Sequence, residues 1–272
     1  MTPRPPSPLD GLRARRRQFG AIHAAAAAAK AIVDRISELL EARLLAIEAS
    51  RGTLGPAHRA YRDHSVPDNR EIWSNWDWRA RGGEEWSESP EWKQALIEDV
   101  LEPTMPEHGV IVEIGPGGGR WSELLQPRAH RLVLIDSSER PLEVCRERFA
   151  AAGNVECLRN DGTDLAAVDD RGADAVWSFD VFVHIAPVDV AAYLSEIARV
   201  LAPGGVAVIH HSGRQDERDP QHQWRAPMTA GLFASLARER GLTVERQFDS
   251  WRDGRFDVGV YGDVISVLRA PH

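Results

Sequence analysis

The chain has 272 residues, of which 43% are hydrophobic and 27% are charged, as in ordinary soluble globular proteins. Its formal net charge of -8 argues against a general nucleic-acid-binding protein, because such proteins need a basic face for phosphates. Two cysteines give neither a disulfide framework nor a CxxC metal pair. No apolar run approaches the roughly 20 residues of a membrane span. We therefore expect a cytoplasmic protein with neither a nucleic-acid nor a membrane partner.

The N-terminal part of the chain begins with a proline-rich stretch, and strong helix formers follow over residues 12–50. Apolar residues recur there at helical spacing, namely Ile32, Ile36, Leu40, Leu44 and Ile47. This stripe predicts an amphipathic helix that packs either on its own domain or on a second copy of the chain. Whether the chain forms a homo-oligomer through this helix therefore remains open.

A polar, glycine-containing segment over residues 61–92 holds five of the nine tryptophans. Aromatic side chains bury large areas and favour interfaces and pockets. The segment is either a structural clasp over the domain or a lid that excludes water from a bound molecule. Ser89 and Pro90 then indicate a helix start, with the serine as N-cap, and this helix is expected to reach residue 101. We place the domain boundary here, with a helical and tryptophan-rich extension at 1–91 and the main domain at 92–272.

From residue 110 onward, strand and helix patterns alternate without a break. Strands are predicted at 110–114, 131–135, 155–159, 173–179 and 206–211, and helices at 138–151, 187–201 and 228–240. Two last strand-like segments, 242–248 and 258–268, are close enough to form an antiparallel pair. The pattern predicts an α/β fold, a Rossmann-like doubly wound, mostly parallel seven-stranded sheet with an antiparallel terminal hairpin.

A glycine-dense turn follows the first strand. It reads Glu113-x-Gly115-x-Gly117-x-Gly119, and the opening of a helix follows it. Such a turn lets the backbone lie against a ligand, and the helix N-terminus offers free N–H groups. A dinucleotide fingerprint would have a third glycine where Arg120 stands, and a P-loop would need a Gly-Lys-Ser/Thr sequence. The turn indicates a nucleotide-type cofactor site of another kind.

Polar residues end the other predicted strands, at the edge where an open α/β sheet binds ligands. Asp136, about 20 residues after the first glycine, is placed to accept hydrogen bonds from ribose hydroxyls, although it could simply cap the next helix. Asp161 could accept the amino group of adenine, and Gly162 leaves room for the flat ring. The alternative for Asp161 is an Asx turn before Thr163.

Taken in order, these motifs resemble those of class I S-adenosylmethionine-dependent methyltransferases. The resemblance also includes the strand end at Asp180 and the turn at residues 201–205, and it covers roughly residues 92–268. It implies S-adenosyl-L-methionine as cofactor. No metal ligands are predicted, although Asp180, His184 and His210 or His211 could form a metal site, since some sugar methyltransferases use a divalent ion. The residues expected to bind the cofactor are Trp92, Glu113, Gly115, Gly117, Gly119, Asp136, Ser137, Asp161, Gly162 and Phe179. The tryptophan-rich entry is similar to that of bacterial methyltransferases acting on sugars or other small metabolites.

Three residues near the same edge are candidate catalytic groups: Asp180, His184 and His211. A hydroxyl acceptor must lose a proton as the methyl group arrives, which suits a histidine base. His210 and His211 are adjacent in one strand, so their side chains should point to opposite faces of the sheet.

The sequence thus predicts a methyltransferase acting on a hydroxyl of a small molecule. The alternatives are an N-methyltransferase of a small amine or amino-acid derivative, a non-catalytic cofactor-binding partner subunit, and an NAD-dependent oxidoreductase. The last is disfavoured by Arg120 and by the absence of an evident Tyr-x-x-x-Lys pair.

Overall fold

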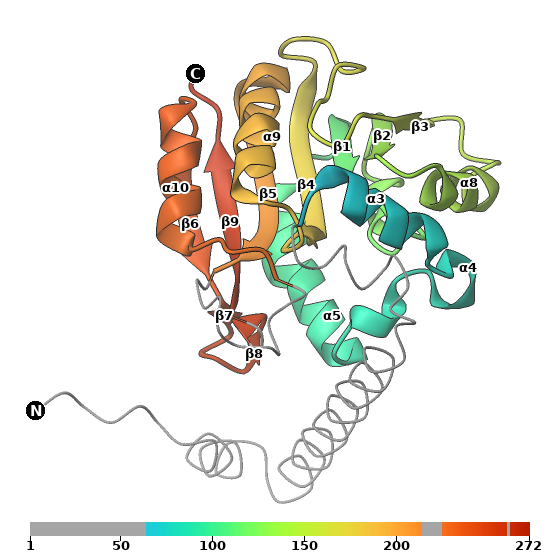
Figure 1. Cartoon of the computed structure of the whole chain (residues 1–272), viewed down its shortest axis with the longest axis horizontal. Coiled ribbons are helices and arrows are strands. Elements are labelled where there is room, and N and C mark those ends of the chain that lie inside the picture. The colour runs from blue at the N-terminus through green and yellow to red at the C-terminus, as the bar shows by residue number, and fades with distance from the viewer. Residues whose placement is uncertain (1–63, 214–224, 260–261) are drawn as a thin grey trace, which may run out of the picture. The chain divides into compact units, whose positions relative to one another are not determined.

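The computed structural model describes residues 64–213, 225–259 and 262–272. The predicted helix over residues 12–50 lies outside these ranges. A seven-stranded sheet with the order β3-β2-β1-β4-β5-β9-β6 forms the centre of the described part (Figure 1). Its strands are β1 (Val110–Ile114), β2 (Arg131–Asp136), β3 (Val155–Arg159), β4 (Ala173–Phe182), β5 (Leu201–Ser212), β6 (Thr243–Phe248) and β9 (Asp263–Arg269).

The strands β1 to β5 pair in parallel, whereas β9 runs antiparallel to both β5 and β6. The predicted mostly parallel Rossmann-like sheet with an antiparallel terminal hairpin is therefore confirmed. A separate two-stranded sheet pairs β7 (Ser250–Trp251) with β8 (Phe256–Asp257). This small hairpin lies within the connection between β6 and β9.

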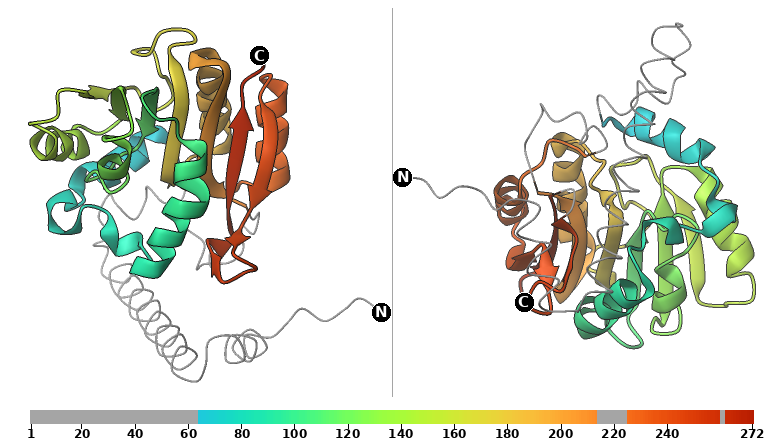
Figure 2. Two further views of the ribbon diagram at one scale, coloured as in Figure 1. Left: turned by 180° about the vertical axis from the view of Figure 1, so that it is seen from behind. Right: turned by 90° about the horizontal axis from the view of Figure 1, so that it is seen from below.

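Helices cover both faces of the sheet (Figures 1 and 2). The main ones are α5 (Pro90–Leu96), α7 (Ser122–Leu125), α8 (Glu139–Arg148), α9 (Pro187–Val200) and α10 (Ala230–Glu239). A π-helical turn (Ile97–Leu101) and α6 (Glu102–Thr104) continue α5 toward the sheet. The first described helices are α3 (Val66–Asn75) and α4 (Trp78–Arg81), and a 3-10 turn (Glu84–Trp86) follows them.

Two apolar cores result, one on each face, because side chains alternate along each strand. On one face, residues of α9 and α10, such as Leu194 and Phe233, pack on Val112 and Ile209. On the other face, Leu96 of α5 packs among residues that include Trp177 and Val208. Neighbouring residues of β5 therefore enter different cores, which decides the surroundings of the two histidines at its end.

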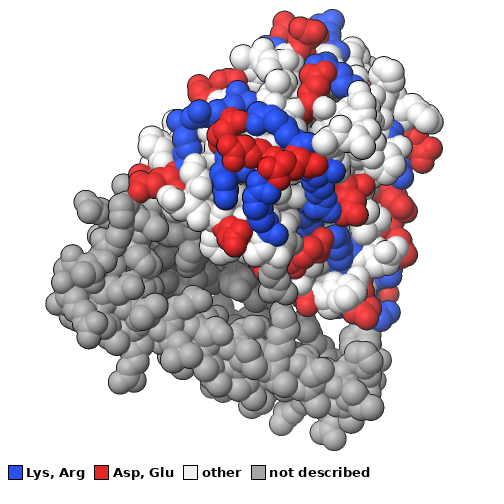
Figure 3. Space-filling view, turned by 90° about the vertical axis from the view of Figure 1, so that its right-hand side faces the viewer, with Lys and Arg blue, Asp and Glu red and all other residues white. Residues whose placement is uncertain are grey.

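The surface over α8 and α4 carries acids and bases side by side (Figure 3). Arg146 pairs with Glu139 in α8, and Arg79 of α4 pairs with Glu147. On this face the arginines are therefore balanced by carboxylates and form no uninterrupted basic surface for phosphates. Among the described residues, no helix is both long enough and apolar enough to span a bilayer.

Candidate active site

The turn after β1 is built from glycines with left-handed backbone. The φ angles of Gly115, Gly117 and Gly119 are 69°, 57° and 88°, a region that residues with a β-carbon rarely adopt. The N–H of Gly115 donates to the carbonyl of Ile135 at 2.8 Å, which ties the turn to β2. A β-carbon on Gly117 would lie 2.5 Å from Cζ3 of Trp78. Both conformation and space therefore require glycine at Gly117.

Glu113 lies inside β1 directly before this turn, and only 1% of its surface is exposed. Its Oε2 accepts a hydrogen bond from Oγ of Ser122 at 2.6 Å. Burial raises the pKa of Glu113 to about 7, although Ser122, Arg120 and Arg148 favour the charged form. A buried carboxyl group with a pKa of about 7 therefore lies directly before the glycine turn.

Asp136 ends β2 beside the turn. Its carboxylate accepts a hydrogen bond from the N–H of Ser138 at 2.8 Å, which forms a turn before the following helix. Ser138 is the N-cap of that helix and no side chain caps it, so Asp136 does not cap it as the sequence alternative suggested. Burial raises the pKa of Asp136 to about 7, against the effect of the neighbouring N–H groups and Arg70. The carbonyl of Ser137 accepts a bond from Nε of Arg159 at 3.1 Å.

At the end of β3, Asp161 forms the Asx turn that the sequence left open. Its Oδ1 accepts bonds from the N–H and Oγ1 of Thr163, at 2.7 and 2.8 Å, and from the N–H of Asp164 at 3.1 Å. These bonds hold the pKa of Asp161 below its ordinary value, although partial burial opposes them. The turn fixes the side chain at the carboxyl edge of the sheet.

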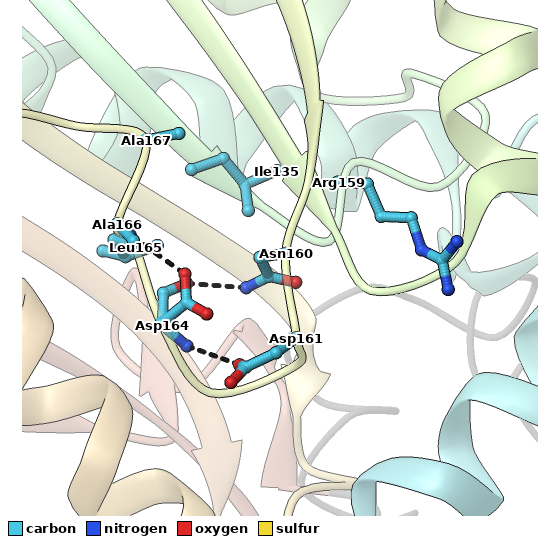
Figure 4. Close-up of a pocket in the computed structure, with 8 residues that line it drawn as sticks. All are labelled: Ile135, Arg159, Asn160, Asp161, Asp164, Leu165, Ala166 and Ala167. Carbon is cyan, nitrogen blue, oxygen red and sulfur yellow. Dashed lines mark hydrogen bonds between the residues drawn. The ribbon is translucent and has the colours of Figure 1, made fainter.

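A pocket of about 410 Å³ opens beside this turn (Figure 4). It is lined by Ile135, Arg159, Asn160, Asp161, Asp164, Leu165, Ala166 and Ala167. The side chain of Arg159 points away from the other lining residues (Figure 4). The pocket therefore combines an apolar wall with carboxylate and amide groups, and it adjoins the ends of β2 and β3.

Residues 64–86, which we call the lid segment, pack on this edge. Val66 lies directly against Gly162, so that a β-carbon on that glycine would overlap its Cγ1. Nη2 of Arg70 donates to the carbonyl of Asp161, and the carbonyl of Arg70 accepts a bond from Oγ of Ser138 at 3.2 Å. In this conformation α3 thus covers the ends of β2 and β3.

Four tryptophans of the lid segment form one cluster. Neighbouring rings of Trp73, Trp76, Trp78 and Trp86 have centroids 5.4–6.1 Å apart. The ring of Trp73 also lies 5.1 Å from that of His184, whose carbonyl accepts a bond from Nδ2 of Asn69 at 2.8 Å. The cluster therefore joins the lid segment to the loop after β4, where the sequence placed a catalytic candidate.

A line of charged side chains, which we call the charged row, crosses the ends of β4, β5 and β9. Its members, in spatial order, are Arg120, Asp180, His210, Asp263 and Arg225. Nδ1 of His210 lies 3.1 Å from Oδ1 of Asp180, and its Nε2 lies 3.6 Å from Oδ2 of Asp263. Nε of Arg225 lies 2.9 Å from the same oxygen of Asp263.

Asp180 occupies an irregular position in β4, with a φ of 60° and a shift in the pairing with β5. Such irregularities redirect a side chain at a sheet edge. Burial alone would raise the pKa of Asp180, but the Arg120 guanidinium and His210 hold it well below its ordinary value. Burial raises the pKa of Asp263 even though Arg225 and His210 lower it.

Phe179 and Trp92 lie in the aromatic core beside the charged row, not over the glycine turn. Phe179 stacks on His210 at 4.3 Å, and its ring is 6.0 Å from that of Trp92. Nε1 of Trp92 donates to the carbonyl of Asp257 at 2.8 Å. The structure thus groups both with the acceptor-side candidates, while their predicted contact with the cofactor stays a prediction.

His211 points to the other face of the sheet, as alternation predicted. It is fully buried, its ring stacks on Phe233 at 3.7 Å, and its nitrogens lie 2.8 Å from the carbonyl of Ser212 and 2.7 Å from Oγ of Ser266. Burial lowers its pKa to about 3, so the ring is neutral near pH 7. The structure does not bring His211 together with Asp180 and His184.

S-adenosylmethionine, the cofactor implied by the resemblance, fits this edge chemically. The glycine turn has a left-handed backbone, Asp136 ends β2 beside it, and a pocket lined by Asp161 lies at the ends of β2 and β3. The buried carboxyl of Glu113 adds a group suited to an ammonium. Among the described residues, no cluster of three or more His, Cys, Asp or Glu side chains is arranged to hold a metal ion.

Sequence reasoning missed Arg120, Ser212 and Asp263 as possible site residues and did not choose His210 over His211. Arg120 and Asp180 are 60 residues apart, so their pairing had no local signal. The only signal in the sequence was that side chains alternate along a strand, which puts residues 210 and 212 on the same face.

Comparison with known proteins agrees with this geometry. Residues 111–205 match a family model described as a methyltransferase domain. A ubiquinone biosynthesis O-methyltransferase of Hahella chejuensis is 32% identical over 95 residues, which are 35% of this chain and 39% of that protein. The chain spans roughly half the length or less of this and the next curated relative that it matches.

Two solved structures share the fold. A chain of the complex between the Haloferax volcanii Trm112 methyltransferase activator and the putative methyltransferase has a TM-score of 0.58 and 23% identity, covering 74% of this chain and 98% of that one. The N-methyltransferase NodS from Bradyrhizobium japonicum, in complex with S-adenosyl-L-homocysteine, has a TM-score of 0.56 and 18% identity, covering 76% and 99%. At these identities they support the fold alone.

Proposed function

The chain carries a class I S-adenosylmethionine-dependent methyltransferase domain, and we propose that the protein transfers the methyl group of this cofactor to a hydroxyl group of a small molecule. The observation behind the proposal is that the glycine turn, Asp136 and the charged row gather at one edge of the sheet. When bound, the cofactor supplies an electrophilic methyl group on a positively charged sulfur. The protein has to hold both partners in line and to exclude water.

For the cofactor side, we propose that Gly115, Gly117 and Gly119 let the backbone approach the methionine part, with Glu113 beneath them. Asp136 accepts hydrogen bonds from the ribose hydroxyls beside Ser137. Asp161 and Gly162 border the adenine, next to the pocket at the end of β3. These roles follow from the positions of the side chains at the carboxyl edge, where open α/β sheets bind ligands.

For the acceptor side, we propose that Asp180 and His184 border the methyl acceptor, and His211 remains the third predicted catalytic residue. The carboxyl of Asp180 is charged because of Arg120 and His210, so it can hold a neighbouring proton carrier in position. The loop that carries His184 touches the lid segment. A role of His211 in proton transfer would have to pass through Ser266.

We further propose that the lid segment covers the bound cofactor. Its contacts with Gly117 and Gly162 lie where the backbone would meet the ligand, so these contacts must give way when the cofactor enters. Closure over the ligand would then exclude water from the reacting atoms. Homo-oligomer formation through the helix predicted at 12–50 remains a prediction, as do the domain boundary at residue 91, the cytoplasmic location and the absence of a nucleic-acid partner.

The test is a methyl-transfer assay on the purified full chain with S-adenosylmethionine carrying a deuterated methyl group. Phenols, monosaccharides and small amines serve as acceptors, and products are identified by mass spectrometry. Methyl ethers from hydroxyl compounds support the proposal. Products formed only from amines would favour the alternative, an N-methyltransferase, in which the carboxylates of the charged row hold an ammonium group. Cofactor binding without any product would favour a non-catalytic partner subunit.

A further inference from the structure

The end of β5 carries two buried polar side-chain atoms that have no hydrogen-bond partner among the residues that the structure describes: Nε2 of His210 and Oγ of Ser212. The two residues are 2% and 1% exposed. Native proteins contain few such atoms, because an unsatisfied buried polar group costs free energy. Their presence at one strand end therefore indicates a place that a polar group of a bound molecule fills.

The hydrogen bond to the other ring nitrogen identifies Nε2 of His210 as a donor. The N–H of Asp180 donates to Nδ1 of His210 at 3.2 Å, so Nδ1 accepts and the ring carries its hydrogen on Nε2. In the charged row, Oδ2 of Asp263 lies 3.6 Å from Nε2. An N–H···O hydrogen bond is about 2.7–3.2 Å long. These two atoms are therefore neighbours without being hydrogen-bonded to each other.

His210, Ser212 and Asp263 share one face of the sheet. His210 and Ser212 are two residues apart in β5, so their side chains point the same way. Ser212 pairs with Asp263 of the antiparallel neighbour β9, which puts that carboxyl group on the same face. The carboxylate of Asp263 accepts hydrogen bonds from Nε of Arg225 at 2.9 and 3.1 Å. The strand ends thus bring together a fixed carboxylate, a ring N–H and a hydroxyl.

A hydroxyl group of a ligand matches this set. Its oxygen can accept a hydrogen bond from Nε2 of His210 while its hydrogen goes to Oδ2 of Asp263, because two atoms 3.6 Å apart can both reach one oxygen. A carbonyl oxygen has no hydrogen to offer Asp263. A carboxylate would place a second negative charge next to Asp263, which is unfavourable in a buried site.

We propose that a phenolic hydroxyl of the methyl acceptor binds here, that its oxygen accepts hydrogen bonds from His210 and Ser212, and that Asp263 takes its proton. The proposal rests on the methyl-transfer function above, and it names the base and the acceptor class of that reaction. It places the acceptor on the opposite face of the sheet from His211.

The aromatic residues on this face favour a phenol over an aliphatic alcohol. Phe179 stacks on His210 at 4.3 Å, and Trp92 and Trp251 belong to the same apolar core as Phe179. Aromatic rings pack well against one another in offset or edge-to-face arrangements. An aromatic ring next to the bound hydroxyl would therefore find matching neighbours.

The surroundings of Asp263 suit a base. Burial raises its pKa above the ordinary aspartate value, although Arg225 favours the charged form. A carboxylate with a raised pKa takes a proton from a hydroxyl more readily than an exposed carboxylate does. At the other end of the charged row, Arg120 directly follows the glycine turn and pairs with Asp180. The row therefore connects the proposed acceptor site with the cofactor side.

The proton transfer balances with the methyl transfer. The O–H bond of the acceptor breaks and its proton goes to Oδ2 of Asp263, while an oxygen lone pair forms the new bond to the methyl carbon. The electrons of the carbon–sulfur bond stay on sulfur, which becomes a neutral thioether. Asp263 returns the proton to solvent after the product leaves.

The first experiment compares phenol with 4-nitrophenol at pH 8 in single-turnover methylation by the wild type and by Asp263→Asn. Asparagine keeps the size of the side chain but cannot take the proton. We expect Asp263→Asn to methylate phenol roughly 100- to 10,000-fold more slowly, the usual contribution of a general base. Because 4-nitrophenol is already ionised at this pH and needs no base, its rate should rise, or fall by less than about threefold.

Asp253→Asn, in an exposed turn, is the matched control, and it should methylate both phenols at the wild-type rate. Calorimetry with S-adenosylhomocysteine should give Asp263→Asn the wild-type affinity within about threefold, which separates a chemical role from damage to the cofactor site. Equal losses with both phenols, or an unchanged rate with phenol, would overturn the assignment of Asp263 as the base.

Ser212→Ala tests the same site with little risk of misfolding, because within the described ranges its hydroxyl has no partner to lose. Its free energy of unfolding should equal or exceed that of the wild type, whereas the KM for phenol should rise about threefold to tenfold through the lost hydrogen bond. An unchanged KM would overturn the inference, whether or not Asp263→Asn folds. A lower free energy of unfolding together with an unchanged KM would mean that these groups hold only a buried water.

The failure of this inference is distinguishable from that of the proposed function. If the wild type methylated monosaccharides but neither phenol, the inference would fail and the methyltransferase proposal would stand. If the wild type methylated no hydroxyl compound, both would fail.

Discussion

The side chain of Val66 in α3 lies directly against Gly162 at the end of β3, with no room for a β-carbon between them. The two residues are 96 positions apart in the sequence, and their contact places the lid segment on the proposed adenine side of the cofactor site. The strands bring the polar residues to one edge, and the lid segment covers that edge. We therefore expect access of the cofactor to depend on the contacts of the lid segment.

Shortening the side chain of Val66 should speed up cofactor binding. Val66→Ala removes two methyl groups from the cover of Gly162, at roughly 0.8 kcal/mol each, so the barrier to lid opening should fall by about 1–1.5 kcal/mol. We expect the association rate of S-adenosylhomocysteine to rise about fivefold to tenfold. Stopped-flow tryptophan fluorescence measures it, because the tryptophan cluster of the lid segment should respond to its movement.

Val188→Ala is the matched control, since this valine of α9 is 74% exposed and far from any such contact. Equal association rates for Val66→Ala and the wild type would mean that the lid segment does not limit access.

Asp136 should contribute to cofactor affinity through its charge. Asp136→Asn keeps the size of the side chain but weakens the acceptor, and a hydrogen bond to a charged group contributes about 1.5–3 kcal/mol. We expect calorimetry to give about tenfold to 100-fold weaker binding of S-adenosylhomocysteine at pH 8. Because burial raises the pKa of Asp136 to about 7, wild-type affinity should also increase from pH 6 to pH 8, and the variant should lose that increase. Asp253→Asn, in an exposed turn, is the control, and a similar effect there would contradict the assignment.

Glu113 should make the protein less stable as the pH rises. Its pKa is about 7 in the folded protein against the ordinary value of 4.5 for a glutamate, so the folded state holds the proton more tightly. This contribution is complete below the unfolded pKa and is lost as the pH rises to about 7. Glu113→Gln stays uncharged, so its free energy of unfolding should fall by about 3 kcal/mol less than that of the wild type between pH 4.5 and pH 8.

Urea unfolding at a series of pH values measures this difference, with exposed Glu71→Gln as the control. Parallel pH profiles for Glu113→Gln and the wild type would show that the carboxyl is charged in the folded protein.

His211, in contrast to Glu113, should make the protein less stable as the pH falls. Burial lowers its pKa to about 3 from the ordinary histidine value of 6.5, so the folded protein resists protonation of the ring. Stability is complete above the unfolded pKa and falls as the pH decreases from 6.5 toward 3, at about 1.4 kcal/mol per pH unit for one group. Urea unfolding of His211→Gln should lack this slope, while His130→Gln should keep it. A slope retained in His211→Gln would assign the acid sensitivity to other groups.

The sequence predicted the parts of the fold that local patterns determine. Residues 110–114 and 155–159 form β1 and β3 with the predicted bounds, because apolar runs there end at turn-forming residues. The prediction of the last strand was wrong at its start, because the strand begins at Asp263 rather than at residue 258. The preceding residues Phe256–Asp257 form a separate strand that pairs with Ser250–Trp251. That small hairpin depends on a tertiary contact, the bond from Trp92 to the carbonyl of Asp257.

The site was predictable only in part, because some of its contacts join segments that are distant in the sequence. Alternation correctly placed His210 and His211 on opposite faces, but it could not show which face meets Asp180. That choice depends on which helices cover each face and on the irregular backbone at Asp180. The ion pair of Arg120 with Asp180 and the contact of Val66 with Gly162 join distant segments, so no local pattern indicates them.

The central claim is that neighbouring strand ends form one site for S-adenosylmethionine. Isothermal titration calorimetry of the full chain with S-adenosylhomocysteine tests it most directly. The account predicts one binding site per chain with a dissociation constant in the micromolar range, and at least tenfold weaker binding to Asp136→Asn. No heat of binding at millimolar ligand with folded protein, or equal affinity in that variant, would contradict it.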